Sequence, residues 1–132
     1  MPEEENVRIV REFVEKVLNE GDMALLAGMV HPDVIVPDSR PGIESLKGIL
    51  LDQRRVFADP EYRVVDVIAQ EEEVAVRFAG KSTHNAAYLG LPATGKRLKM
   101  WGVMIFRFEG RRIAEFWSVL ETPSILRQLR ER

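Results

Sequence analysis

The chain has 132 residues, of which 45% are hydrophobic and 30% charged, and its formal net charge is −2. This length and composition predict one globular domain, residues 1–132, with enough apolar residues for a core. The near-neutral charge and the lack of a basic stripe argue against nucleic acid as a partner. With no cysteine and two histidines at unrelated positions, the chain has no disulfide framework, and we expect no metal site.

The sequence also bears on location. Residues 1–5 are acidic and lack the apolar run of a signal peptide, and no apolar stretch reaches the length of a membrane span. We therefore expect a cytoplasmic protein that does not bind membranes.

The first half of the chain predicts helices. Residues 3–19 have apolar residues at helical spacing and acidic residues in the first turn. Asp22 predicts the N-cap of a short second helix, which His31-Pro32 ends. After a short buried strand at residues 34–36 and a turn-rich segment, a longer helix is expected from about Pro41 to Phe57.

From residue 62 onward the pattern predicts strands in series. Residues 62–68 form the first, a charged turn follows, and residues 74–84 form the second. In the second strand Val74, Val76, Phe78 and Gly80 share one face, which Ser82 and His84 continue. His84 should therefore point to the buried side near the end of this strand.

Residues 98–120 predict a hairpin around the turn Glu109-Gly110, because aromatic and β-branched residues flank an acidic-Gly pair. A two-residue turn there sets Met104 beside Glu115 and places Trp117 on the same, otherwise apolar face. Three explanations of the single carboxylate stay open: the face lines a pocket, Glu115 has a hidden partner, or the register differs.

A short helix after Thr122-Pro123 completes the chain. The order, helices first and then strands without alternation, predicts an α+β fold with helices packed in a strongly curved antiparallel sheet. Such a sheet forms a cone, and a small molecule would bind in its interior.

Four stretches together resemble a known family: Thr83-His84, Leu89–Lys96, Ile105–Trp117 and Leu126–Leu129. They are similar to the SnoaL-like polyketide cyclases, which belong to the nuclear transport factor 2-like superfamily together with ketosteroid isomerase. The resemblance implies a cone-shaped α+β barrel, often a homodimer through the outer sheet face. It also implies a deep apolar cavity in which acid–base residues catalyse the reaction without a cofactor. Members cyclise, isomerise, dehydrate or hydrolyse different substrates, so the fold alone does not fix the reaction.

Three residues are candidates for catalysis: Asp38, His84 and Glu115. Val36-Pro37-Asp38 resembles the strand end that carries the general base of ketosteroid isomerase, while the alternative for Asp38 is a turn or helix cap. His84 is either a proton donor or oxyanion stabiliser, or a half-buried histidine bonded to the backbone. Glu115 is either a buried base or one half of an ion pair with a basic residue.

The residues expected to line the pocket come from helices and strands: Phe13, Val36, Phe57, Met100, Met104, Phe106 and Trp117. The opposite face of the hairpin carries Trp101, Val103, Ile105 and Phe116. So much apolar surface on the outside favours a homodimer interface.

The first hypothesis is an enzyme that performs acid–base chemistry beside a carbonyl of a small hydrophobic substrate, with Asp38 or Glu115 as base and His84 assisting. The second is a non-catalytic ligand-binding or dimerisation module. It is favoured by the lack of a histidine between Arg97 and Phe108 and by Ser118 after the tryptophan. An epoxide hydrolase ranks third, because it needs an Asp–Arg–Asp set and Asp38 is the only clear cavity aspartate.

Overall fold

The computed structural model describes residues 2–131. Helix α1 (Pro2–Glu12) runs directly into a π-helical segment, η1 (Phe13–Asn19), which confirms the helix expected over residues 3–19. The residues that make this helix amphipathic are buried, Phe13 and Val17 among them.

Three short elements follow: the 3-10 helix η2 (Met23–Leu25), the helix α2 (Leu26–Met29) and the strand β1 (Val30–Ile35). The strand begins earlier than expected, so His31-Pro32 lies inside it. β1 is the edge strand of the sheet, and its register shifts between its two ends. An irregular edge strand tolerates a proline because the missing N–H is not needed for pairing.

The rest of the fold consists of α3 (Ile43–Val56), β2 (Phe57–Gln70), β3 (Glu73–His84), β4 (Arg97–Glu109), β5 (Arg112–Leu120) and α4 (Thr122–Arg130). β2 starts directly after α3. Asp59-Pro60 therefore lies in a strand, where the pairing with β3 shifts between Ala58 and Glu61.

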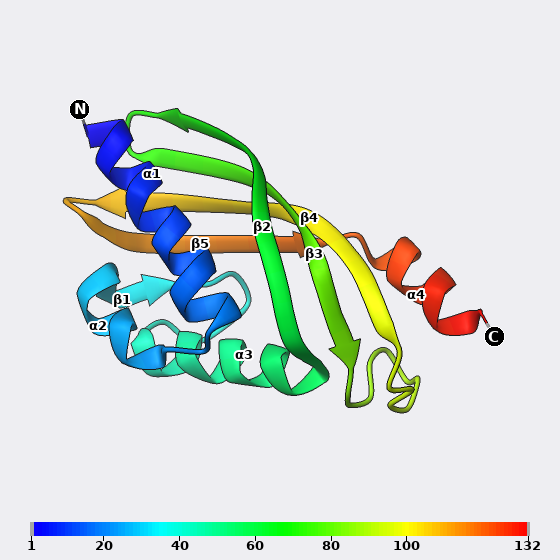
Figure 1. The fold of residues 1–132 in the computed structure, drawn as a ribbon. Helices are drawn as coiled ribbons and strands as arrows, with labels where there is room; N and C mark the ends of the chain where they lie inside the picture. Colours follow the sequence, from blue (N-terminus) through cyan, green and yellow to red (C-terminus); the bar gives the residue numbers. More distant parts are fainter. Residues whose placement is uncertain (1, 132) are drawn as a thin grey trace.

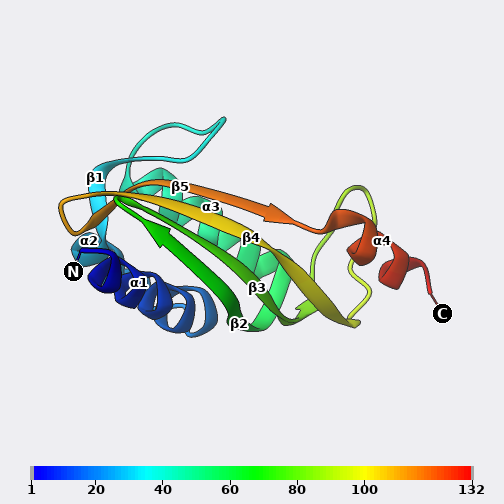
Figure 2. The same ribbon diagram turned by 90° about the horizontal axis from the view of Figure 1, so that it is seen from above.

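The five strands form one sheet in the order β1-β5-β4-β3-β2. Neighbours are antiparallel except β1, which runs parallel to β5. The fold is therefore α+β as expected, with a mixed rather than a wholly antiparallel sheet. Helices α1 and α3 lie on one face of the curved sheet, and α4 extends beyond its end, near the C-terminus (Figure 1). Seen from above, the loop between β1 and α3 projects away from the sheet (Figure 2). Within residues 2–131 no helix is both long and apolar enough to cross a bilayer.

The hairpin of β4 and β5 turns one step later than expected. Glu109 lies opposite Arg112, so the turn is Gly110-Arg111. Gly110 has a φ of +63°, which suits the first position of a two-residue hairpin turn. This shift alone would keep every residue of β5 on its expected face, because it changes the pairing by an even number of residues.

A β-bulge at Ala114 then reverses the faces. Phe108 pairs with Ile113, but the next residue of β4, Arg107, pairs with Glu115, so Ala114 is an extra residue in β5. Both Ile113 and Ala114 are buried. All residues of β5 after the bulge consequently lie on the face opposite to the expected one.

The placement of Glu115 and Trp117 on the inner face is therefore wrong. Trp117 pairs with Ile105 on the outer face, where 47% of its surface is exposed. Phe116, expected outside, points inward instead and packs against Phe106, with 5.1 Å between ring centroids. The bulge stabilises the fold because it buries both Ile113 and Phe116 and leaves the carboxylate outside.

The inner face of the sheet carries two apolar clusters. The main cluster packs α1, η1 and α3 against the sheet and includes Phe13, Phe106 and Phe116. The second lies toward the end that α4 covers, and its members are Val56, Phe57, Leu98, Met100, Ile125 and Leu129. This second cluster surrounds the end of β3, where His84 lies.

Asn19 fastens the end of η1 to the sheet. Its side-chain amide donates to the carbonyl of Tyr62, and its side-chain oxygen accepts the N–H of Tyr62, both at 2.7 Å. Beside it, Arg54 of α3 donates to the carbonyls of Leu18 and Asn19 at 2.6 and 3.0 Å, as a cation does at a helix C-terminus.

Replacing this side chain gives a test of the fold. Asn19→Ala leaves the two backbone groups of Tyr62 without partners and should lower the free energy of unfolding by about 2 kcal/mol or more. Asn85→Ala is the matched control, because Asn85 is exposed and makes one long bond of 3.4 Å. It should change stability by less than about 0.5 kcal/mol. Equal effects of the two substitutions in urea denaturation would contradict the role of Asn19.

Candidate functional site

The candidate site lies at the inner face of the last residues of β3. Its alternate residues Gly80, Ser82 and His84 are buried, which confirms the inward parity expected for this strand. His84 is fully buried and lies opposite Phe57, the first residue of β2. The strand therefore carries two polar side chains into an apolar end of the cone.

His84 makes side-chain contacts through one ring nitrogen. Its Nδ1 lies 2.9 Å from Thr94 Oγ1 and accepts the backbone N–H of Thr94 at 3.2 Å. Its Nε2 is buried, and no partner lies within hydrogen-bonding distance in the part of the chain that the structure describes. An unpaired buried polar atom costs about 1–3 kcal/mol, so this nitrogen marks a place where a ligand atom would be stabilising.

Ser82 and Tyr62 add two hydroxyl groups to this surface. Ser82 Oγ lies 2.6 Å from Met100 Sδ, and the Tyr62 hydroxyl lies 3.9 Å from the same sulfur. Tyr62 packs against Gly80, where an added Cβ would come within 2.7 Å of the Tyr62 Cα, so only glycine fits opposite this ring. Burial raises the pKa of the Tyr62 phenol, an effect offset only in part by the Ser82 hydroxyl and by the charges of Arg54 and Arg97.

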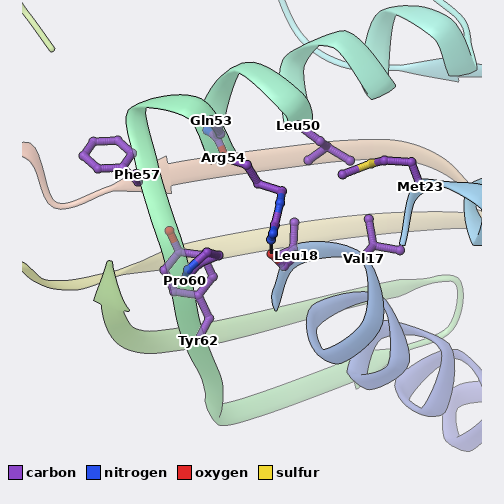
Figure 3. A pocket seen from close by; sticks show the side chains of 9 residues that line it. All are labelled: Val17, Leu18, Met23, Leu50, Gln53, Arg54, Phe57, Pro60 and Tyr62. Atoms are coloured by element: carbon purple, nitrogen blue, oxygen red, sulfur yellow. Dashed lines mark hydrogen bonds between the residues drawn. The ribbon is translucent and has the colours of Figure 1, made fainter. Parts of the chain in front are cut away.

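A small cavity lies beside this surface, between η1, α3 and the start of β2 (Figure 3). Its volume is about 10 Å³, which is room for one water molecule. Its lining is Val17, Leu18, Met23, Leu50, Gln53, Arg54, Phe57, Pro60 and Tyr62. This cavity is therefore too small to hold an organic ligand.

An open groove of about 470 Å³ lies by the C-terminal end of α3 and the end of β5. It is lined by Asp52, Gln53, Val56, Phe57, Tyr88, Ser118, Val119, Leu120 and Thr122. Phe57 and Gln53 border both the groove and the small cavity. The ring of Phe57 packs on that of Tyr88, with 4.9 Å between centroids. Phe57 thus stands between open solvent and the interior near His84.

The structure separates the three candidate catalytic residues. Only His84 is inside. Asp38 is exposed in the loop after β1, with a φ of +59°. Glu115 lies on the outer face, where its carboxylate accepts the indole N–H of Trp117 at 2.6 Å and lies 3.8 Å from Arg107. Its outward position removes the argument that placed a base on the inner face.

The expected pocket residues divide in the same way. Phe57 and Met100 belong to the cluster around His84. Phe13, Met104 and Phe106 are buried in the main cluster and Val36 packs against it. Trp117 is outside and lines no interior surface.

Sequence reasoning missed Thr94 and Tyr62 as members of the site. Tyr62 and Val64 share the inward face by simple alternation, because both bulges of β2 lie outside residues 62–64, but the faces of this strand were not assigned from the sequence. Thr94 belongs to the stretch Leu89–Lys96, which carries part of the family resemblance, but no sequence pattern connects it with His84. Among residues 2–131, no three histidine or acidic side chains gather closely enough to hold a metal ion.

A curved sheet wrapped around helices, with a polar group at the inner end of a strand, defines a cone-shaped α+β fold. Residues 8–129 match the family model of the SnoaL-like polyketide cyclases, and the chain belongs to this family. Among curated proteins, none matches the chain.

Solved structures share the fold at low identity. TsrD from Streptomyces laurentii is 22% identical, with a TM-score of 0.85 and 96% of each chain covered. A SnoaL-like polyketide cyclase from Agrobacterium tumefaciens is 23% identical, with a TM-score of 0.84, covering 94% of this chain and 97% of that one. AclR from Streptomyces galilaeus, a proposed hydroxylase, is 23% identical, with a TM-score of 0.80 and 96% of each chain covered. At such identities these likenesses show the fold and leave the reaction open.

The raised pKa of Tyr62 gives a test of this geometry. Because the folded state holds the phenol proton more tightly than the unfolded chain, this stabilisation is complete below the ordinary value of 10.0 and is lost as the pH rises through the raised pKa. Stability measured by urea denaturation at rising alkaline pH should therefore fall more steeply in the wild type than in Tyr62→Phe.

In the Tyr88→Phe variant, where Tyr62 is the one remaining tyrosine, the ultraviolet absorbance of tyrosinate should appear above pH 10.0. Ionisation of Tyr62 at or below its ordinary value would contradict the burial of this ring.

Proposed function

We propose that the chain binds a small apolar molecule through its carbonyl group and promotes proton transfer at the carbon beside that carbonyl. The observation that supports this most is the Nε2 atom of His84, which is buried and unpaired at the inner face of the sheet. A carbonyl oxygen placed there would accept a hydrogen bond and restore the missing partner. Membership in a family named for polyketide cyclases agrees with a substrate of this kind.

The surroundings of His84 suit an apolar substrate. Phe57, Leu98 and Met100 form the walls, and Ile125 and Leu129 of α4 close the end. Hydrogen bonds in such a water-poor setting stabilise developing charge more strongly than they do in water. The Ser82 and Tyr62 hydroxyls are the second and third groups available to an oxygen-rich ligand.

Asp38 is our proposed base, and because it is exposed in the loop after β1, apart from His84, this loop would have to bring its carboxylate to the ligand. Its carboxylate would take a proton from the carbon beside the carbonyl, the C–H electrons would form a carbon–carbon double bond, and the carbonyl oxygen would take the negative charge. The oxygen would be stabilised by His84. The φ of Asp38, +59°, lies in the left-handed region, which aspartate adopts more readily than most residues and which is also found at functional sites.

Binding requires the interior to open, since the cavity holds only about 10 Å³. Phe57 is the side chain that separates the groove from the interior. A rotation of its ring away from Tyr88 would join the two spaces, and a ligand could then approach from the groove.

A second candidate function is a binding or dimerisation module without catalysis. The small size of the cavity favours it, and so does the contact between Glu115 and Arg107. The two functions differ in a measurable way, because a binder would take up a ketone without labilising its protons.

Proton exchange provides the test. Acetophenone in deuterium oxide exchanges its methyl protons through its enol, which proton NMR follows directly. The wild type should accelerate this exchange, and His84→Asn should reduce the acceleration by about 100-fold or more, the effect of losing one oxyanion donor. Asparagine keeps an acceptor for the Thr94 N–H and lacks the donor at the Nε2 position.

His31→Asn is the matched control, because His31 is partly exposed on β1 and contacts Glu109. It should leave the exchange rate unchanged. Asp38→Asn should lower the rate by about 100-fold or more, as loss of a general base does, whereas Asp33→Asn in the same region should not. If ketone binds with no exchange above the solvent rate, the module without catalysis is the correct function.

We also propose that the chain forms a homodimer through the outer face of the sheet. The centre of this face is apolar and exposed, and it consists of Trp101, Val103, Ile105, Trp117 and Val119. Neighbouring charges on this face, Arg77 with Asp66 and Arg107 with Glu115, are paired within the chain. Two copies would therefore meet without a large repulsive charge, and an apolar centre with a polar rim is typical of such interfaces.

Sedimentation velocity tests the dimer. Ile105→Lys places a charge in the apolar centre and should convert a dimer to a monomer. Leu51→Lys is the matched control, because Leu51 is an equally exposed apolar residue on α3, away from the sheet face. A wild-type chain that sediments as a monomer at high concentration would contradict the interface.

A further inference from the structure

The segment Thr94–Lys96 wraps around His84. The N–H of His84 donates to the carbonyl of Lys96, and the N–H of Gly95 donates to the carbonyl of His84, both at 2.9 Å. Gly95 has a φ of +72°, which lets the chain turn back toward the ring. Together with the two contacts of Thr94 to Nδ1, this segment fixes both the backbone and the ring of His84.

The donors around Nδ1 determine where the ring proton is. The backbone N–H of Thr94 points at Nδ1 from 3.2 Å, and an N–H can only donate. The Thr94 hydroxyl oxygen already accepts the N–H of Lys96 at 3.2 Å, so its own proton is available for Nδ1 at 2.9 Å. Nδ1 therefore acts as an acceptor and carries no proton. A neutral imidazole has one N–H, which must then be on Nε2.

We propose that Thr94 is a positioning residue that holds His84 in the tautomer with its proton on Nε2. In this tautomer His84 presents a hydrogen-bond donor to the interior and offers no lone pair there, so it polarises a ligand oxygen and does not remove a proton from carbon. The ligand atom that fits is an acceptor without a proton of its own, such as a ketone oxygen or an enolate. The role toward a ligand rests on the proposed function, whereas the tautomer itself does not.

The segment Thr94–Lys96 is also held in place by contacts with the C-terminal helix. The Nζ of Lys96 donates to the carbonyls of Gln128 and Leu129 at 3.2 and 3.3 Å, and also to that of Glu131. Gln128 and Leu129 are in the last turn of α4 and Glu131 follows its end, and a lysine satisfies carbonyls at such a helix C-terminus favourably. The position of Thr94 thus depends on α4 as well as on its own loop, and α4 also closes the apolar end around His84.

Nitrogen-15 NMR of histidine-labelled protein tests the tautomer without any ligand. A long-range proton–nitrogen correlation distinguishes protonated from unprotonated ring nitrogens, and His31→Asn leaves His84 as the one histidine to observe. The spectrum should show Nδ1 unprotonated and Nε2 protonated. Thr94→Val in this background removes the hydroxyl and leaves the backbone N–H as the single donor to Nδ1, so a minor population of the other tautomer should appear and the Nδ1 signal should move part of the way toward the protonated position. Thr94→Ser keeps the hydroxyl and should restore the original spectrum.

Thr83→Val is the matched control, since Thr83 is the neighbour of His84 on the outer face and its hydroxyl accepts from Arg97 at 3.1 Å. It should leave the ring signals of His84 in place. A proton on Nδ1 before any change at position 94 would overturn the proposed tautomer, and a Thr94→Val spectrum identical to its parent would overturn the role of Thr94. Because these spectra need no turnover, a correct tautomer combined with no proton exchange in acetophenone would contradict the proposed function alone.

Discussion

The contact of three phenylalanine rings holds the two layers of the fold together. Phe13 of η1 lies 5.5 Å from both Phe106 of β4 and Phe116 of β5, and the two strand residues are 5.1 Å apart. Aromatic rings at such distances add to the stability that their burial supplies. Phe116 reaches this contact only because the bulge at Ala114 turns it inward. The same bulge sends Glu115 and Trp117 to the outer face, so one irregular residue decides which side chains meet a ligand and which meet solvent or a second copy.

Much of the architecture could be predicted from the sequence because it follows from periodicity. The helical spacing around Phe13, the alternation that brings His84 inward and the hairpin at Gly110 all depend on neighbouring residues. The register of β5 could not be predicted by strict alternation, because Ile113 and Ala114 are consecutive buried residues and only the three-dimensional packing shows which one is extra. The tie between Asn19 and Tyr62 likewise joins residues far apart in the chain.

The candidate site also has one part that could be predicted from the sequence and one part that only the fold shows. His84 could be proposed from the parity of β3, whereas its tautomer depends on Thr94, which only the folded loop brings to it. The sequence favours Asp38 and Glu115 as bases for their chemistry and their place in a pattern, and the structure leaves neither beside His84. The interior that remains has a neutral donor, two hydroxyls and apolar walls. Such a site is suited to holding an oxygen and stabilising charge on it, and the base has to come from another part of the chain.

This division of roles also explains the burial of a histidine with one free nitrogen. An unpaired N–H inside a folded protein is destabilising by about 1–3 kcal/mol, and a ligand oxygen that accepts its proton recovers that free energy. The free energy of unfolding is thus lower than it would be with an apolar residue at this position. Part of the binding free energy of a ketone comes from giving the Nε2 N–H of His84 an acceptor.

Infrared difference spectroscopy of bound acetophenone tests the central claim most directly, because the carbonyl stretch reports the hydrogen bond at the ligand oxygen. With carbon-13 in the carbonyl, the bound band can be separated from protein absorption. The donor at Nε2 predicts a band at lower frequency than in an apolar solvent, and a return toward that solvent value in His84→Asn. The same frequency in the wild type and in His84→Asn would contradict the account.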